Sequence, residues 1–457
     1  MKVLVIVLVA ISIVGIFLVY QTTGPLDSRI TLTQRDIKKV LLLSVDDLRP
    51  DYLTPYNPGL GTSPNLARFA ADGLLFTNVV SQATSTLVSH KSIFYSLYPS
   101  VHKTTLKHVP EETLVNPVEA LRSAGFRTAA FVGGGQLRAK FGFDRGFQSY
   151  ETLAKKKVLD RGEDPLEVLR GNALEWVREN RDDDFFLFLH TYEVHCPYTP
   201  PARFVKKYAG WYEGEIKPRG KCGARYYNKR EMSEEDYRYV GDLYAAGVAY
   251  VDDFVGKLFD GLKEIGVYDE MIIIVLSDHG ESLGEHDYIG HNRLYEEQLK
   301  IPLMMRIPGV NAATINAPVE AIDIMPTLFS ILGLQPPYSF QGQDLVPDIA
   351  GKREADTNRR RIAEAGKGIA IQSGDWKLVF DSRDPKEDAL FDLRSDPKET
   401  DNVASEHPQI VSDLRNYYAA MIGASQGLAS RFEVSGTNVL ELDEQTKQEL
   451  RALGYIR

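Results

Sequence analysis

The sequence of 457 residues contains only two cysteines, no long run of basic residues and no internal repeat. Two thiols allow at most one internal disulfide, so Cys196 and Cys222 are either that pair or two unpaired residues. The net charge of -10 and the missing basic run argue against nucleic acid as the main partner. The apolar share of 43% and the charged share of 25% are typical of a globular protein.

The N-terminus carries a long uncharged stretch, from Val3 to Tyr20. Its length is near the minimum that spans a bilayer as a helix. No small-x-small cleavage site or lipidation cysteine follows it, which favours an uncleaved signal-anchor over residues 1–22. Lys2 and the amino terminus, the only nearby positive charges, precede the span. The N-terminus is therefore expected inside, and the rest of the chain in the periplasm, the lumen or the exterior.

Short apolar runs alternate with helical patterns from Lys39 onward. Their continuous hydrophobicity is typical of strands buried on both faces of a parallel sheet that helices cover. The runs comprise residues 40–45, 128–133, 185–190, 271–277 and 301–308, and helical patterns lie between them, as at 165–180 and 322–333. This order predicts an α/β sandwich with a largely parallel central sheet.

The pattern changes after about Gly351. Short antiparallel strands are expected at 369–380 and 388–393, and helices at 408–421 and 442–455. We therefore divide the chain into four parts, namely an anchor (1–22), a linker (23–38), a large α/β domain (39–350) and a C-terminal α+β subdomain with terminal helices (351–457).

Acidic residues and a histidine follow two of the predicted strands. Asp46 and Asp47 follow the first run, and Asp278 and His279 follow the fourth in the same relation. Ligands of open α/β sheets bind beyond the carboxyl ends of strands. Carboxylates side by side are costly there unless a cation or hydrogen-bond donors neutralise them. We therefore predict that these four residues share one divalent cation, with Ca2+, Mg2+, Mn2+ and Zn2+ all compatible with the ligand set.

A helix is predicted to begin near Thr86, in the stretch from Ala83 to Pro99, and its start is rich in hydroxyl groups. Such hydroxyls often cap first-turn N–H groups. A helix N-terminus also attracts anions, and a hydroxyl there could attack one. A cation, a helix N-terminus and a hydroxyl together suit attack on a tetrahedral oxyanion ester.

Several segments, in order, resemble the sulfatase family of the alkaline phosphatase superfamily. They include LLLSVDDLRPDYL, FFLFLHTYEVHCPYTPP, SDHGESLGEHDYIGHNRLYEEQLKIPLMM and AIDIMPTLFSILGL. The resemblance extends from about Lys39 to the C-terminus and implies an alkaline-phosphatase-like fold with its catalytic domain at 39–350. It also implies one divalent metal ion, of which Ca2+ is the most typical of the family, and it places Asp46, Asp47, Asp278 and His279 on the family's metal ligands.

The resemblance assigns roles to three histidines as well. His195 falls on a histidine that contacts the anion or assists the leaving group. His291 falls where many sulfatases have a lysine that touches the anion, and His90 where they have an arginine. His195 or His291 is therefore expected to protonate the leaving oxygen, and His90 with the first-turn N–H groups to hold the nonbridging oxygens.

Two segments depart from the sulfatase pattern. Thr86 occupies the position of the cysteine or serine that matures to formylglycine, so the resemblance implies Thr86 as the nucleophile and as an additional metal ligand. Because threonine has an extra methyl on the carbon to be oxidised, no formylglycine is expected. The segment from Phe126 to Leu137, FRTAAFVGGGQL, replaces a Gly-Lys-Trp-His-like anion-binding segment. Threonine is the nucleophile in other branches of the superfamily, which keeps phosphate esters beside sulfate esters as substrates.

The sequence thus predicts a membrane-anchored, metal-dependent hydrolase of sulfate or phosphate esters in a small molecule, glycan or lipid. A phosphoethanolamine-like transferase and a non-catalytic binding protein with the same fold stay open as alternatives. So does a second metal bound by His195, Glu193 or His291. Glu281 is expected to be a solvated loop residue, and nothing in the sequence indicates an oligomeric state.

Overall fold

The computed structural model describes residues 38–453 apart from 107–108, 110, 113–114, 154, 218–225, 382–383 and 434–441. The predicted anchor and nearly all of the linker lie outside the described residues, as does Cys222. Cys196 is disulfide-bonded and is therefore not an unpaired thiol. Within the described ranges, no helix is both long and apolar enough to cross a bilayer.

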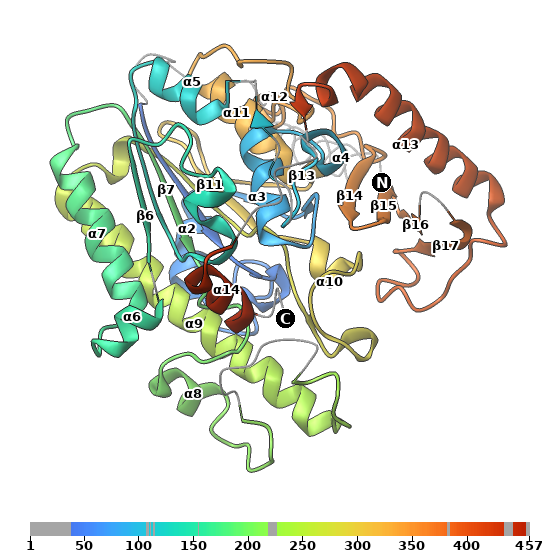
Figure 1. Cartoon of the computed structure of the whole chain (residues 1–457), viewed down its shortest axis with the longest axis horizontal. Helices are drawn as coiled ribbons and strands as arrows, with labels where there is room; N and C mark the ends of the chain where they lie inside the picture. The colour runs from blue at the N-terminus through green and yellow to red at the C-terminus, as the bar shows by residue number, and fades with distance from the viewer. Residues whose placement is uncertain are drawn as a thin grey trace, which may run out of the picture.

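A central sheet of eight strands organises the molecule (Figure 1). In spatial order the strands are β12 (Ala313–Ile315), β2 (Leu74–Phe76), β11 (Leu303–Arg306), β8 (Met271–Leu276), β1 (Lys39–Val45), β7 (Phe185–Thr191), β5 (Arg127–Val132) and β6 (Ser149–Thr152). The five strands from β8 to β6 are mutually parallel, whereas β11 pairs antiparallel with both β8 and β2. The prediction of a largely parallel sheet is confirmed.

The sequence of the middle strand β1 is continuously apolar because both faces of the strand are buried. Leu41 and Leu43 pack into the hydrophobic core on one face of the sheet, and Val40 and Leu42 pack into the core on the other. All four side chains are buried. A strand with a core on each face has no solvent side, so no polar residue alternates along it.

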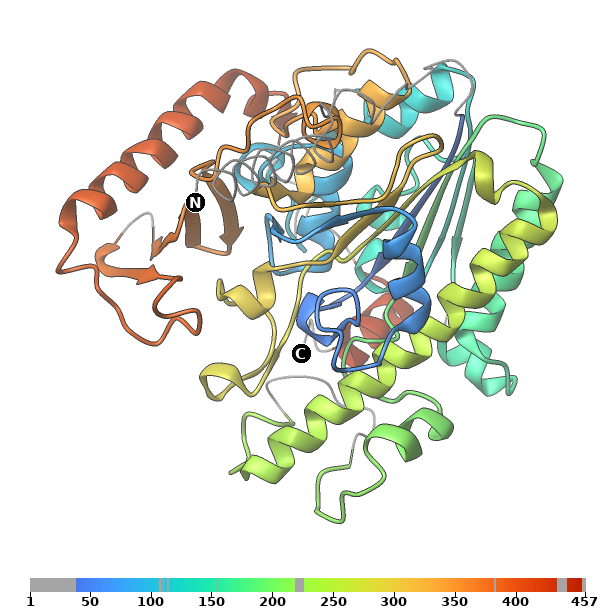
Figure 2. The ribbon, with the colours of Figure 1, turned by 180° about the vertical axis from the view of Figure 1, so that it is seen from behind.

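Helices cover both faces of the sheet, which confirms the predicted sandwich. One face packs against α2 (Pro64–Ala71), α7 (Pro165–Glu179) and α9 (Glu234–Ile265), and the other against α3 (Thr86–Tyr95), α5 (Pro117–Ser123) and α11 (Ile324–Ile331). Figure 2 shows α9 as the long yellow-green helix along the first face. Shorter helices are α4 (Pro99–His102), α6 (Lys155–Asp160), α8 (Ala202–Tyr208), α10 (Glu296–Leu299) and α12 (Val346–Ile349).

The C-terminal part forms a separate antiparallel sheet followed by a long helix, as predicted. The sheet consists of β14 (Arg361–Ala365), β15 (Gly368–Ser373), β16 (Trp376–Asp381) and β17 (Asp384–Asp392), and the helix is α13 (Pro408–Ala429). Figure 1 shows this part beside the α/β domain. The two-stranded pairings are β3 (Val79–Val80) with β13 (Val319–Glu320), β9 (Ser282–Leu283) with β10 (Ile289–Gly290), and β4 (Glu111–Glu112) with β18 (Phe432–Glu433).

The last helix, α14 (Glu444–Ala452), differs from the expectation for a terminal helix of the C-terminal subdomain. It packs against the turn Gly135–Leu137 that follows β5. Ion pairs join Arg138 to Glu449 and Lys140 to Asp443. The division of the chain at residue 350 stays a prediction, but α14 lies against the α/β domain.

Candidate active site

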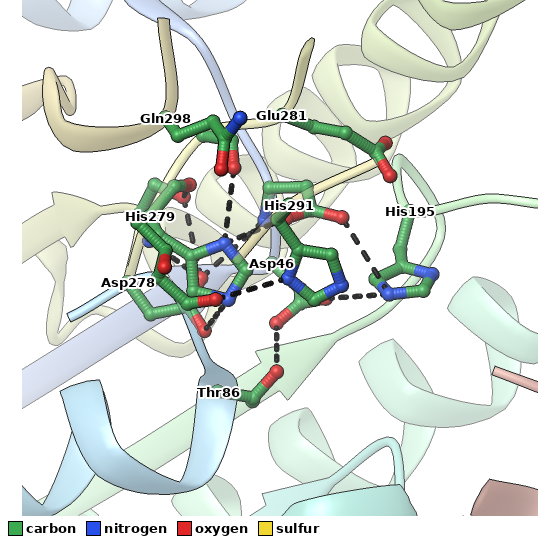
Figure 3. A network of polar contacts seen from close by, with 12 residues as sticks. Asp46, Thr86, His195, Asp278, His279, Glu281, His291 and Gln298 are labelled. Atoms are coloured by element: carbon green, nitrogen blue, oxygen red, sulfur yellow. Dashed lines mark hydrogen bonds and ion pairs between the residues drawn. The ribbon is translucent and has the colours of Figure 1, made fainter. Parts of the chain in front are cut away.

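The side chains that the sequence singles out meet at the carboxyl ends of three neighbouring strands, β8, β1 and β7 (Figure 3). Parallel strands end at the same edge of a sheet, so residues far apart in the sequence come together there. The N-terminus of α3 lies at the same edge. The buried side chains brought together in this way are Asp46, Asp47, Thr86, His195, Asp278, His279 and His291.

Thr86 is the first residue of α3 and is fully buried. Its hydroxyl Oγ1 donates a hydrogen bond to Asp46 Oδ1 at 2.9 Å. The preceding residue, Ser85, is extended, and its side chain does not cap the helix. The Thr86 hydroxyl is therefore directed into the carboxylate cluster.

The residues that can ligate a metal fall into two adjacent groups. In each group the ligand atoms lie within 4.8 Å of one another. The first group is Asp46, Asp278 and His279, and the second is Asp47, His195 and His291. The four residues predicted to share one cation are thus brought together, but Asp47 groups with two histidines. Glu193 belongs to neither group, because its carboxylate forms an ion pair with Lys155 Nζ at 2.8 Å.

The two histidines of the second group have defined tautomers. His195 Nδ1 donates to the carbonyl oxygen of Cys196 at 2.6 Å, and His291 Nδ1 donates to that of Thr84 at 3.2 Å. A carbonyl oxygen only accepts, so the N–H is at Nδ1 and the lone pair at Nε2. Burial lowers the pKa of His195 to about 4 and the pKa of His291 well below its ordinary value. Neutral rings held in this way are typical of metal ligands.

Electrostatics of the cluster fit a bound cation. Burial raises the pKa of the Asp46 and Asp47 carboxyls well above the ordinary value, and the next largest causes are Asp278 for Asp46 and Glu281 for Asp47. Within the described part of the chain, several buried atoms here have no hydrogen-bond partner, namely Asp46 Oδ2, Asp47 Oδ2, Asp278 Oδ2 and His279 Nε2. Unpartnered buried polar atoms are rare in folded proteins. A divalent cation would both neutralise these carboxylates and ligate these atoms.

His90 borders the site, with its Nδ1 3.4 Å from Asp278 Oδ2. Its Nδ1 donates to the carbonyl oxygen of Thr86 at 2.8 Å, and its Nε2 is 2.9 Å from Ser44 Oγ. Both ring nitrogens are thus engaged, and the ring packs edge-on against Phe188. The expectation that His90 holds substrate oxygens stays a prediction, and in this structure its hydrogen bonds tie α3 to β1.

The backbone N–H groups in the first turn of α3 are also less available to a substrate than expected. The N–H of Leu87 donates to Gln136 Oε1 at 2.6 Å. Gln136 belongs to the turn after β5, which is the strand next to β7. The sequence signal for this residue was its position just beyond a strand exit, the same signal that identified the aspartates.

Glu281 is a second residue whose role the sequence did not indicate. Its side chain is fully buried, and its Oε2 accepts a hydrogen bond from Tyr198 Oη at 2.6 Å. Burial raises the pKa of Glu281 to about 7. The expectation of a solvated loop residue is wrong, since the loop folds inward beneath Tyr198 and brings Glu281 next to Asp47.

The α/β sandwich, with a buried Asp/His centre at the strand ends and a hydroxyl at a helix N-terminus, defines the alkaline-phosphatase-like class of proteins. The family model Sulfatase matches residues 38–334. A second model, N-sulphoglucosamine sulphohydrolase, C-terminal, matches residues 284–422. The chain belongs to the sulfatase family.

Comparisons with individual proteins agree with this assignment. Choline-sulfatase of Rhizobium meliloti is 33% identical over 190 residues, which are 40% of this chain but only 36% of that protein. The multifunctional alkaline phosphatase superfamily protein PehA of Trinickia caryophylli is 23% identical over 83% of this chain and 93% of its own length. The phosphonate monoester hydrolase of Agrobacterium radiobacter has the same fold, with a TM-score of 0.70 at 20% identity over 86% of this chain and 96% of its own.

Proposed function

We propose that the protein is a metal-dependent hydrolase of sulfate or phosphate esters and that Thr86 is its nucleophile. The observation that carries the proposal is the hydrogen bond from Thr86 Oγ1 to Asp46 Oδ1, 2.9 Å long, inside a cluster of buried metal-ligating side chains. A cation bound there would lower the pKa of the hydroxyl and offset negative charge on the ester. Family membership supports ester hydrolysis as the reaction class.

The reaction has two steps on this chain's own residues. Thr86 Oγ1 attacks sulfur or phosphorus and passes its proton along the hydrogen bond to Asp46, while the bond to the leaving oxygen breaks and that oxygen takes a proton from solvent as it departs. Water then attacks sulfur or phosphorus of the threonine ester, the bond to Oγ1 breaks, and Oγ1 regains a proton as sulfate or phosphate is released. The burial of Thr86 keeps bulk water away from Oγ1 in the first step.

We further propose that Asp47, His195 and His291 hold a second cation. The support is their grouping within 4.8 Å and the fixed Nδ1–H of both rings. A ring whose N–H is donated to a carbonyl has no proton at Nε2 for the leaving oxygen. This replaces the expectation that His195 or His291 is the general acid.

For location, we propose that residues 1–22 anchor the protein in a membrane, with the remainder extracytoplasmic. The support is the uncharged stretch from Val3 to Tyr20 and the charges before it. The native protein should fractionate with membranes and resist high-salt extraction. Isolation of a chain whose N-terminus begins beyond Tyr20 would instead indicate a cleaved signal peptide.

The test of the proposed reaction uses Thr86→Ala and Thr86→Ser with aryl sulfate, aryl phosphate and phosphodiester substrates in the presence of Ca2+, Mn2+ or Zn2+. Thr86→Ala should lose orders of magnitude in kcat, because no covalent intermediate forms. Thr86→Ser should retain measurable turnover, because the hydroxyl remains.

The matched control is Thr327→Ala. Thr327 is also a buried threonine whose hydroxyl is hydrogen-bonded, to the carbonyl oxygen of Asp323 at 2.6 Å, but it belongs to α11. Its loss should affect stability and leave kcat per folded molecule unchanged. If the Thr86 hydroxyl only contributes a buried hydrogen bond to Asp46, Thr86→Ala will cost about 1–3 kcal/mol of stability and stay active, which would refute the mechanism.

A further inference from the structure

Gln136 is fully buried at the N-terminus of the helix that carries Thr86. Its Oε1 accepts hydrogen bonds from the N–H of Leu87 at 2.6 Å and from Ser85 Oγ at 3.1 Å. Because a backbone N–H only donates, the oxygen and nitrogen of this amide are assigned without ambiguity. Nε2 is therefore a donor, and it belongs to a side chain whose Oε1 contacts both neighbours of Thr86, Ser85 and Leu87.

This Nε2 donor has no partner within the described parts of the chain, although it is buried. Buried amide donors are almost always hydrogen-bonded in folded proteins, so an exception beside a nucleophile points to a bound acceptor. The acceptor must be small enough to reach the first turn of α3. An oxyanion of the ester group meets this requirement.

Tyr192 holds Gln136 in place at the same point. Its Oη accepts the N–H of Gln136 at 3.2 Å, and the hydroxyl also forms a hydrogen bond with the side chain of Thr86. Because Thr86 Oγ1 donates its only proton to Asp46, the phenol donates its own proton to Thr86 Oγ1. Tyr192 thus links the turn that carries Gln136 to the hydroxyl of Thr86.

The glycines before Gln136 make room for this tyrosine. A Cβ at Gly133 would lie 2.8 Å from Tyr192 Cδ2, and a Cβ at Gly135 would lie 2.9 Å from Tyr192 Oη. Gly134 and Gly135 also have φ of +88° and +56°, a conformation that favours glycine. On its outer side the turn packs against α14, where Leu453 is 2.7 Å from the same Gly135 Cβ position. The turn Gly133–Gln136 thus packs closely against Tyr192 on its inner side and against α14 on its outer side.

We propose that Gln136 Nε2 donates a hydrogen bond to a nonbridging oxygen of the substrate's sulfate or phosphate group. This donor does the work that the sequence assigned to His90 and the first-turn N–H groups. The inference rests on the proposed function of the site, but oxyanion binding is measurable without turnover.

The test measures the affinity of the metal-loaded protein for inorganic sulfate and inorganic phosphate by calorimetry, beside kcat and KM. Gln136→Glu keeps the acceptor for Leu87 and replaces the donor by a carboxylate oxygen. It should weaken oxyanion binding at least tenfold and lower kcat by about 10²–10³. Tyr192→Phe should weaken both in the same direction. Metal content should be unchanged in both variants.

Two matched controls separate this role from a structural one. Gln341 Oε1 likewise accepts a backbone N–H, that of Tyr98 at 2.9 Å, while its Nε2 donates to Ser425 Oγ at 2.9 Å. Tyr56 Oη is hydrogen-bonded to backbone groups between β2 and β11. Gln341→Glu and Tyr56→Phe should change the melting temperature without changing oxyanion affinity.

The outcomes also distinguish this inference from the proposed reaction. An active Thr86→Ala protein whose Gln136→Glu variant binds oxyanions weakly would refute Thr86 as the nucleophile and retain Gln136 as the oxyanion donor. Unchanged oxyanion affinity in Gln136→Glu and Tyr192→Phe would overturn the inference, whatever the fate of Thr86. Failure of the wild-type protein to bind either oxyanion would overturn it as well.

Discussion

Two buried clusters of charge in this protein differ in how their carboxylates are neutralised. At the strand ends, Asp46, Asp47 and Asp278 are buried together, and their ion-pair partners within the described ranges are histidines, not lysine or arginine. Between α10 and the C-terminal sheet, Glu296 and Glu399 are buried as well, but a lysine lies between them.

That lysine, Lys377, is fully buried on β16. Its Nζ is 3.0 Å from Glu296 Oε1 and 2.6 Å from Glu399 Oε1. Lys300 Nζ lies 3.0 Å from the other Glu296 oxygen. The second cluster therefore carries its own cations, whereas the first has a set of unpartnered ligand atoms. The second cluster therefore joins α10 to the C-terminal sheet through ion pairs, whereas the first cluster is suited to bind a metal ion.

Removal of metal should have the largest effect, and only on the first cluster. We expect chelation to abolish turnover and to lower the free energy of unfolding by about 4 kcal/mol for each cation removed, relative to protein at a cation concentration 1,000 times its Kd. Elemental analysis should find two divalent cations per wild-type chain and one in His195→Ala or His291→Ala. A single cation in the wild-type protein would refute the second metal site.

Loss of the positive charge of Lys377 should destabilise the second cluster. Lys377→Met leaves two buried carboxylates without their shared partner and should cost about 3–5 kcal/mol of stability, measured by urea unfolding. Because the cluster does not touch Thr86, kcat per folded molecule should be unchanged. Adding Glu296→Gln and Glu399→Gln should recover part of the loss. A stable Lys377→Met protein would contradict the structural role assigned to this cluster.

Much of the fold could be predicted because local patterns determined it. The apolar runs that became β1, β5, β7 and β8 are buried on both faces, so each was recognisable without its neighbours. The helix α9 is absent from the sequence-based predictions, although Ser233 and Asp236 form a capping box at its start. The position of α14 had no local signal, because its ion pairs with Arg138 and Lys140 join residues about 300 positions apart.

The site was predictable where residue type alone carries chemistry. Aspartates and a histidine just beyond strands indicated a metal centre, and the structure brings them together. The tautomers of His195 and His291, the engagement of His90 and the burial of Glu281 depend on contacts between distant segments. No pattern in one sequence encodes such contacts. Gln136 was missed because glutamine is seldom a catalytic group, although its turn follows a strand exit.

Lowering the pH should produce the smallest change in the free energy of unfolding. The second cluster determines whether that change is a gain or a loss. Burial raises the pKa of Glu296, but Lys377 and Lys300 outweigh it, and the pKa falls from 4.5 to about 2. Its contribution to stability is therefore complete above about pH 4.5 and is lost as the pH falls toward 2. The pKa of Glu399 is raised, chiefly by burial, which acts in the opposite direction and offsets part of the loss.

We therefore expect the wild-type protein to lose about 1–3 kcal/mol from this cluster between pH 5 and pH 3, less than Lys377→Met costs at neutral pH. Urea unfolding across that range should show a flatter acid limb for Glu296→Gln, because glutamine has no proton to bind. The exposed Glu175→Gln is the control and should follow the wild-type curve. Parallel curves for the wild-type protein and Glu296→Gln would mean that the ion pair with Lys377 adds no stability, and the contrast between the two clusters would then rest on the metal centre alone.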